Sequence, residues 1–204
     1  MKKNKYSGLF VAFDGPNGVG KSTLIEYVQT DLVEKGINVW ITKEPTNTQL
    51  GNFTRQIAET LESESLTCLV AADRYQHLGN EIIPNLKEKQ VVLTDRYILS
   101  SLILQRMDNV DVDFILATNK NIILPDIQIV VTADQDVIQA RLNERERLTR
   151  FEQGKRTSEE LHFLKEGAEI LKNLGVEIII IENSGDLSTN VSAIAKHIQK
   201  VVKQ

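Results

Sequence analysis

The chain has 204 residues, a formal net charge of −4 and a hydrophobic fraction of 41%, which is typical of a globular domain and excludes a disordered or collagen-like protein. Its single cysteine, Cys68, excludes an internal disulfide, and one Cys with three His argues against a zinc site. The acidic balance argues against nucleic-acid binding, and no apolar run approaches the roughly 18 residues of a membrane span. We therefore expect one cytoplasmic domain, residues 1–204, that binds neither nucleic acid nor membrane.

Short apolar or β-branched runs alternate along the chain with longer segments of helical periodicity. This alternation is typical of βαβ units around a parallel sheet, and uninterrupted apolar strands indicate burial on both faces. Gly36 and Gly175 follow two helical segments, where glycine commonly ends a helix. The pattern predicts a three-layer α/β fold with a five-stranded parallel sheet flanked by helices. The predicted strands are 9–13, 38–42, 91–94, 127–132 and 176–181, and the predicted helices are 21–35, 66–89, 134–147, 158–173 and 188–202.

Between the first predicted strand and helix, residues 15–22 read Gly-Pro-Asn-Gly-Val-Gly-Lys-Ser. This is the spacing of a phosphate-binding loop (P-loop), in which backbone N–H groups and the helix dipole converge on phosphate. Lys21 would reach the β- and γ-phosphates, and the Ser22 hydroxyl would help to hold Mg²⁺. The alternative is a glycine-rich turn with a chance Lys-Ser. The predicted nucleotide-binding residues are Gly15, Pro16, Asn17, Gly18, Val19, Gly20, Lys21, Ser22 and Thr23.

Asp95 ends the third predicted strand, in the segment Val91-Val-Leu-Thr-Asp95. An acid at a strand end is, on its own, as often a turn or helix-cap residue as a functional one. Beside a P-loop, such a carboxylate is expected next to the magnesium ion. The predicted metal site therefore consists of Ser22 and Asp95, with Mg²⁺ as the cofactor.

Other motifs separate the classes of P-loop protein. A guanine-specific GTPase needs Asn-Lys-x-Asp, but the nearest match, Asn119-Lys-Asn-Ile122, lacks the acid. Asp95 begins Asp-Arg-Tyr-Ile and not the Asp-x-x-Gly of a GTPase switch. A chain of 204 residues also leaves little room for the accessory domains of a motor or helicase. After these exclusions, the predicted class of protein is a compact phosphotransferase.

Several segments, taken in order, resemble the thymidylate kinase family of nucleoside monophosphate kinases, and the resemblance covers roughly residues 9–152. The matching segments are Asp14 before the first P-loop glycine, Thr-Lys-Glu-Pro at 42–45 with Arg55 behind it, Ala-Asp-Arg-Tyr-Gln-His at 72–77, Asp-Arg-Tyr-Ile-Leu-Ser-Ser at 95–101 followed by Gln105, Pro125-Asp126, and Arg150-Phe-Glu152 at the end of the family's lid.

The resemblance implies transfer of a phosphoryl group from ATP to a nucleoside monophosphate, with dTMP as the expected acceptor, and it implies a homodimer. Arg96, helped by Arg55, would clamp the acceptor phosphate, because a guanidinium fork matches phosphate oxygens. Arg74 would hydrogen-bond the base edge, and Asp14 would lie near the sugar or the metal. The implied acceptor-binding residues are Asp14, Glu44, Pro45, Arg55, Val70, Arg74, Arg96, Ser100, Ser101 and Gln105.

A charged segment near residues 143–157 is predicted to be a mobile lid. The P-loop itself carries no basic side chain between Pro16 and Val19, so another segment must help Lys21 to neutralise the transition state. We expect a lid arginine to enter the site on closure. The alternative is a solvated helix with alternating charges. The predicted catalytic residues are Lys21, Arg96, Arg145, Arg147 and Arg150.

Three departures from the family pattern concern the acceptor site. Thr46 and Asn47 stand where two glycines are usual, Val70 stands where an aromatic residue usually stacks on the base, and Leu104 replaces a tyrosine near the sugar. Two alternatives to a dTMP kinase therefore stay open. One is a kinase for another nucleotide or nucleotide-like monophosphate, and the other is a nucleotide-binding relative without catalysis.

Overall fold

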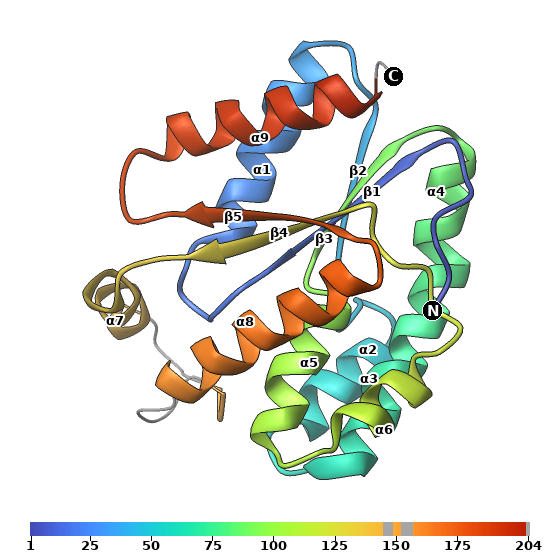
Figure 1. Ribbon diagram of the computed structural model, residues 1–204, viewed down its shortest axis with the longest axis vertical. Coiled ribbons are helices and arrows are strands. Elements are labelled where there is room, and N and C mark those ends of the chain that lie inside the picture. The colour runs from blue at the N-terminus through green and yellow to red at the C-terminus, as the bar shows by residue number, and fades with distance from the viewer. Residues whose placement is uncertain (145–148, 152–156, 203–204) are drawn as a thin grey trace.

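The computed structural model describes residues 1–144, 149–151 and 157–202. Within these residues a five-stranded parallel sheet has the order β2-β3-β1-β4-β5 (Figure 1). All five predicted strands are confirmed, with ends that differ by at most one residue. The strands are β1 (Leu9–Asp14), β2 (Val39–Lys43), β3 (Val91–Asp95), β4 (Ile127–Thr132) and β5 (Glu177–Glu182).

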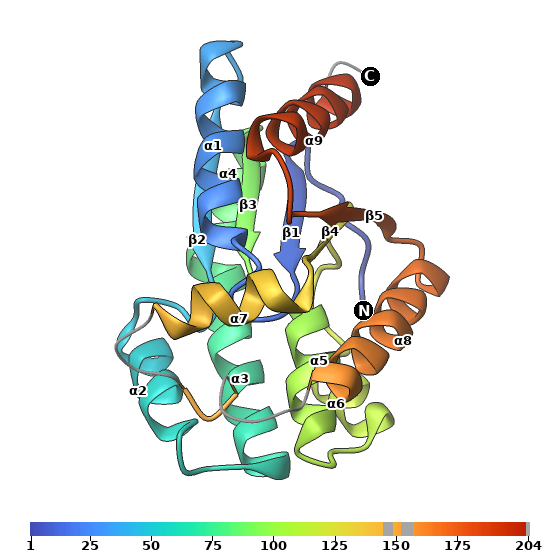
Figure 2. The ribbon, with the colours of Figure 1, turned by 90° about the vertical axis from the view of Figure 1, so that its left-hand side faces the viewer.

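Helices cover both faces of the sheet and give the predicted three layers (Figures 1 and 2). One face carries α1 (Lys21–Glu34) and α9 (Leu187–Val202), and the other carries α4 (Ile83–Lys87), α5 (Ile98–Met107) and α8 (Thr157–Asn173). The remaining described helices are α2 (Gln49–Ile57), α3 (Ser63–His77), α6 (Val112–Thr118) and α7 (Gln135–Asn143), and a π-helical turn, Leu78–Ile82, joins α3 to α4. No helix of the described segments is both long and apolar enough to cross a membrane.

The central strand β1 contributes side chains to the two hydrophobic cores, one on each face of the sheet, because successive side chains of a strand point to opposite faces. Val11 and Phe13 pack into the cluster under α1 and α9. Phe10 and Ala12 pack into the cluster under α4, α5 and α8. All four side chains are fully buried, so the strand that leads into the P-loop is fixed from both sides.

The structure differs from the predicted elements in several places. The single helix expected over 66–89 is α3, the π-helical turn and α4 in succession. Helices α2, α5 and α6 are absent from the helices that apolar periodicity predicts. The α5 helix is buried on most of its surface, so it has no polar stripe that would reveal a helical period. The helix expected over 134–147 is described as far as Asn143, and most of the expected lid, 145–148 and 152–156, lies outside the described residues.

The prediction that all strands are buried on both faces is wrong for β2 and β5. These strands form the two edges of the sheet, and Trp40 on β2 and Ile180 on β5 are 42% and 68% exposed. An apolar run alone does not reveal whether a strand lies at an edge. The two expected helix ends are confirmed, since Gly36 and Gly175 adopt left-handed φ angles of +79° and +90° two positions beyond the last residues of α1 and α8.

The parallel arrangement brings the carboxyl ends of three strands together. Asp95 at the end of β3 is in register with Phe13 of β1 and with Lys43 of β2. Backbone bonds continue this edge beyond the sheet, because Arg96 N–H donates to the Phe13 carbonyl at 2.8 Å and Glu44 N–H donates to the Asp95 carbonyl at 3.0 Å. Ligands of open α/β sheets bind at such an edge.

The loop after β2 is fitted closely against α2. Thr46 is 1% exposed, and a Cβ atom on Gly51 of α2 would overlap both the carbonyl oxygen and the hydroxyl of Thr46. Position 51 therefore has room for glycine alone while Thr46 occupies its site.

We expect Gly51→Ala to lower the free energy of unfolding by about 1–3 kcal/mol, because the added methyl group must displace the Thr46 backbone. Gly79→Ala is the matched control, since nothing lies within 4 Å of its Cβ position, and it should leave stability unchanged or raise it by up to about 1 kcal/mol. Urea unfolding of both variants measures the difference. Equal stability of the two would contradict the close fit.

Candidate active site

The P-loop lies between β1 and α1, as predicted. Gly18 and Gly20 adopt φ angles of +81° and +88°, a region that side chains other than glycine rarely enter. A Cβ atom on Gly15 would overlap the Val131 carbonyl of β4. The loop therefore depends on its glycines, and it ends at the N-terminus of α1, where the helix dipole favours an anion.

Lys21 points back over this loop. Its Nζ donates to the Gly15 and Pro16 carbonyls, each at 2.9 Å, and the side chain is buried. Burial, followed by the positive charge of Arg96, lowers the pKa of Lys21 to about 7. The ammonium is thus held by neutral carbonyls, at a place where a phosphate would stabilise its charge.

Ser22 and Asp95 meet as predicted for a metal site. The Ser22 hydroxyl donates to Asp95 Oδ2 at 2.6 Å, while Asp95 Oδ1 is buried and has no hydrogen-bond partner among the described residues. The described residues contain no cluster of three His, Cys, Asp or Glu side chains that could hold a metal. One hydroxyl and one carboxylate with a free oxygen suit Mg²⁺, which takes its other ligands from nucleotide phosphates and water.

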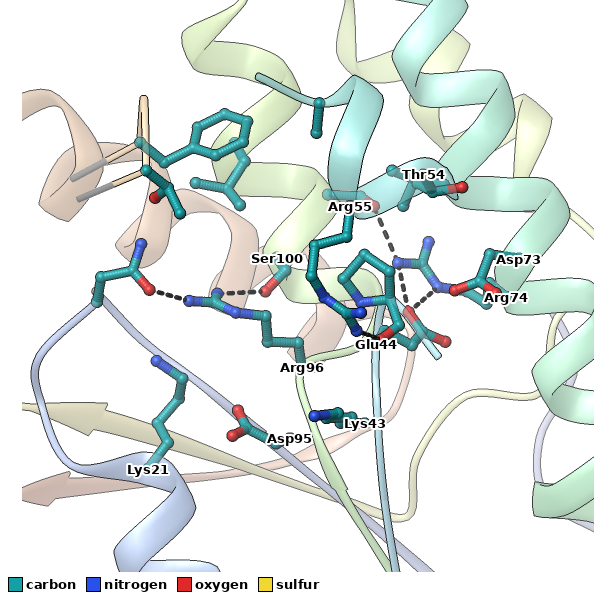
Figure 3. Close-up of a pocket in the computed structure, with 18 of the residues that line it drawn as sticks. Lys21, Lys43, Glu44, Thr54, Arg55, Asp73, Arg74, Asp95, Arg96 and Ser100 are labelled. Atoms are coloured by element: carbon teal, nitrogen blue, oxygen red, sulfur yellow. Dashed lines mark hydrogen bonds and ion pairs between the residues drawn. The ribbon is translucent and has the colours of Figure 1, made fainter. Parts of the chain in front are cut away.

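Arg96 links the P-loop to the helix that follows β3 (Figure 3). It adopts a left-handed φ of +73°, and its guanidinium donates to Asn17 Oδ1 at 2.7 Å and to the Ser100 hydroxyl at 2.9 Å. Ser100 in turn donates to Asp14. Asp14 is fully buried, and burial raises the pKa of its carboxyl group. Asp14 thus lies behind the site as a support for Ser100.

A cavity of about 520 Å³ extends from the P-loop to α2, α3 and α5. It brings together most of the predicted nucleotide-, metal- and acceptor-binding residues. Asp14, Gly15, Pro16 and Val19 do not line it. The predicted residues that do are Asn17, Gly18, Gly20, Lys21, Ser22, Thr23, Glu44, Pro45, Arg55, Val70, Arg74, Asp95, Arg96, Ser100, Ser101 and Gln105.

Arg74 forms part of the far wall of the cavity and is itself 1% exposed. It pairs with Glu44 and also donates to Asn119, Ser101 and the Tyr97 carbonyl. These contacts use four of its five N–H groups. Its predicted contact with a base edge stays a prediction, with one N–H left for it.

Two other polar atoms at this end of the cavity have no hydrogen-bond partner in the part of the chain that the structure describes. The Thr54 hydroxyl and Gln105 Oε1 are both buried and line the cavity. Gln105 was predicted from the family resemblance, whereas Thr54 was not predicted, because a threonine in a helix carries no signal of its own. Buried polar groups without partners are rare, and here they are available to a ligand.

The departures at Thr46 and Asn47 do not narrow the cavity, since neither residue lines it. Thr46 turns away and donates to Asp73 through its backbone N–H at 2.8 Å and its hydroxyl at 2.6 Å. Val70 and Leu104 do line the cavity, so the aliphatic character expected from the sequence is present at the acceptor end.

Of the three predicted lid arginines, the structure describes Arg150 alone. Arg145 and Arg147 lie outside the described residues. Arg150 does not line the cavity; it forms a two-point ion pair with Asp108, at 2.9 and 2.7 Å, and donates to the Ala58 and Leu61 carbonyls. In this arrangement Arg150 fastens its segment to α2 and α5, and its predicted catalytic role stays untested.

Three residues near the P-loop were not assigned a site role from the sequence. Arg141 of α7 donates to the Val19 carbonyl at 3.1 Å, and the Asn183 amide donates to the same carbonyl at 2.8 Å, so both support the loop from outside. Glu160 of α8 faces Arg96 and Lys21; burial raises the pKa of its carboxyl group, and these two cations oppose that shift. Nothing in the sequence distinguishes Glu160 from its neighbour Glu159.

Comparisons with known proteins agree with this geometry. A family model described as thymidylate kinase matches residues 13–194. A probable thymidylate kinase from Caldivirga maquilingensis is 38% identical over 148 residues, which are 71% of this chain and 72% of that protein. A probable thymidylate kinase from Pyrococcus horikoshii is 28% identical over 199 residues, which are 93% and 97% of the two chains.

Among solved structures, the crystal structure of thymidylate kinase from Ehrlichia chaffeensis superposes with a TM-score of 0.72 at 25% identity, covering 94% of this chain and 98% of that one. The family model spans most of the chain, including the P-loop, Asp95 and Arg96. The chain therefore belongs to the thymidylate kinase family.

Proposed function

We propose that the protein transfers the γ-phosphoryl group of Mg-ATP to dTMP and releases dTDP and ADP. The observation that carries the proposal is the placement of Arg96, which is held by Asn17 of the P-loop on one side and by Ser100 of the acceptor wall on the other. A guanidinium in this position can contact the acceptor phosphate and the transferred group together. The two nucleotides would lie in one continuous cavity.

In the proposed reaction an oxygen of the dTMP phosphate attacks the γ-phosphorus, and the bond between this phosphorus and the oxygen bridging to the β-phosphate breaks. Lys21 would leave the Gly15 and Pro16 carbonyls to contact the β- and γ-phosphates. Ser22 and Asp95 would hold Mg²⁺, which supplies charge neutralisation on the ATP phosphates when it is bound. Arg96 would offset the repulsion between the two phosphate groups, so the chain contributes position and charge.

We expect a pyrimidine base at the acceptor end of the cavity, where aliphatic residues replace the aromatic residues of the family pattern and where Phe151 lines the same cavity. Val70 and Leu104 give it aliphatic walls, while Gln105 and Thr54 give it unpaired polar atoms. A kinase for another nucleoside monophosphate stays the second candidate because of these aliphatic walls. A binding protein without catalysis fits less well, since it has little use for an acceptor clamp such as Arg96.

We expect dTMP to be the best acceptor among dTMP, dUMP, UMP, CMP, dCMP, GMP and AMP in a coupled assay of ADP release with Mg-ATP. Arg96→Ala should lower kcat/KM for the acceptor by about 10²–10³, the usual loss for a group that stabilises transition-state charge. Preference for another acceptor would reassign the substrate. Binding of ATP without any turnover would favour the non-catalytic alternative.

The low pKa of Lys21 gives a test of its phosphate contact. Above pH 7 the free amine predominates in the protein without ligand, because its pKa is about 7. Bound phosphate favours the ammonium form, so binding of Mg-ATP at pH 8 should take up roughly 0.5–1 proton, and affinity should fall as the pH rises from 7 to 9. Calorimetry in two buffers of different ionisation enthalpy measures the uptake. Lys21→Arg, which stays protonated, should take up none, and zero uptake by the unmodified protein would contradict the assignment.

We also propose a homodimer formed through α2, α3 and α6, together with the cytoplasmic location expected from the sequence. Helix α3 packs against both α2 and α6, and the three helices carry the exposed apolar side chains Phe53, Tyr75 and Phe114. Light scattering should give twice the mass of one chain, and Phe53→Asp should shift the protein toward monomer. Ile180→Ser is the control, because Ile180 is exposed on the distant edge strand β5. An equal effect of both substitutions would contradict this interface.

A further inference from the structure

A buried group of polar and charged side chains lies behind the acceptor end of the cavity. Thr42 belongs to β2, Glu44 follows this strand, Arg74 and His77 lie one turn apart on α3, and Glu81 belongs to the π-helical turn. Glu44, Arg74 and His77 are all buried. Only Glu44 and Arg74 of this group line the cavity (Figure 3). Any effect of the other three residues on a bound ligand must therefore pass through Glu44 or Arg74.

The charge of Arg74 is compensated by Glu44. Glu44 Oε2 lies 2.9 Å from Nε and 2.8 Å from Nη2 of the guanidinium. It is the one carboxylate paired with Arg74 among the described residues, because the other acceptors of Arg74 are neutral. A guanidinium at this depth needs a paired anion. The position of Oε2 therefore determines how Arg74 faces the cavity.

His77 holds the second oxygen of the same carboxylate. His77 Nδ1 lies 3.1 Å from Glu44 Oε1, and Nδ1 is the donor because a carboxylate only accepts. On its other side, Nε2 lies 2.7 Å from the Thr42 hydroxyl, which donates to Glu81 at 2.7 Å. The imidazole thus ties the carboxylate to β2 and to the π-helical turn.

We infer that His77 is a positioning residue for the acceptor nucleotide: it fixes the rotation of the Glu44 carboxylate, and through it the guanidinium of Arg74. Without the imidazole, Glu44 Oε1 would be buried without that donor, which is unfavourable for a charged oxygen. The carboxylate then turns toward another donor, and Oε2 leaves Arg74. The acceptor site loses its shape, whereas the contacts of Lys21 with the P-loop carbonyls are unchanged.

Two conservative substitutions separate the two nitrogens of the ring. The amide of His77→Asn lies near the position of Nδ1 and can still donate to Glu44. The amide of His77→Gln lies near the position of Nε2, so it reaches Thr42 and leaves Glu44 without its donor. Both variants lose the ring, and their thermal stabilities report any general loss of packing.

We expect His77→Gln to raise the KM for the acceptor about tenfold, which corresponds to the loss of one charged hydrogen bond, and His77→Asn to raise it less than about threefold. The KM for ATP should change less than about twofold in both variants. A purely structural role would change both variants in proportion to their stability, without regard to which nitrogen is replaced. Equal acceptor KM values for the two variants would overturn the inference.

A second pair of variants covers the case in which His77 substitutions fail to fold. Thr42→Val removes the hydroxyl between His77 and Glu81 and should raise the acceptor KM. Thr67→Val is the matched control on α3, because Thr67 is also buried and its hydroxyl bonds only the Ser63 carbonyl among the described residues. An unchanged acceptor KM in Thr42→Val would overturn the inference.

The inference rests on the proposed function, so wild-type kinetics are measured first with the acceptor that the nucleotide panel selects. If no acceptor is turned over, the proposed function fails, and the inference is decided by the Nε–H signal of Arg74 in ¹H–¹⁵N spectra. This signal should keep its position in His77→Asn and Thr67→Val and should shift or exchange away in His77→Gln. An unshifted signal in His77→Gln would contradict the inference.

Discussion

The repulsion between Lys21 and Arg96 is the constraint on which the site depends. Both cations face the same end of one cavity, and the charge of Arg96 is the second cause, after burial, of the lowered pKa of Lys21. Asp95, Asp14 and Glu160 act against this repulsion from a distance. The two positive charges are fully neutralised only when phosphate groups bind in the cavity. The electrostatic potential of the folded protein therefore complements the negative charge of its substrates.

The chain uses arginine in two different electrical settings. Arg96 is held by an amide and a hydroxyl, so its positive charge stays available to a phosphate. Arg74 is paired with a carboxylate, so this pair adds no net charge to the wall of the cavity. Lys21 follows the first pattern, since its partners are backbone carbonyls. The cations beside the P-loop therefore have neutral partners, and the arginine at the far wall of the cavity has an ionic one.

Much of the fold and the phosphate end of the site could be predicted because their signals are local. The P-loop is one continuous segment between a strand and a helix, and Asp95 is recognisable as the end of a buried strand. The base end depends on contacts between distant segments, such as Glu44 with Arg74 and Thr46 with Asp73, and no spacing in the sequence reveals these. The buried helix α5 and the edge positions of β2 and β5 were missed for a related reason, since hydrophobicity alone does not show which neighbours an element has.

The position of Thr46 restricts which residues the chain can carry at position 51. Thr46 fills the space that a side chain at position 51 would need, and Asp73 receives its hydroxyl and its backbone N–H. A side chain at position 51 would overlap the backbone carbonyl oxygen and nitrogen of Thr46 as well as its hydroxyl, so a smaller side chain at position 46 would not make room for it. The requirement for glycine at position 51 is therefore set by the path of the backbone at position 46 and not by the chemistry of the nucleotide.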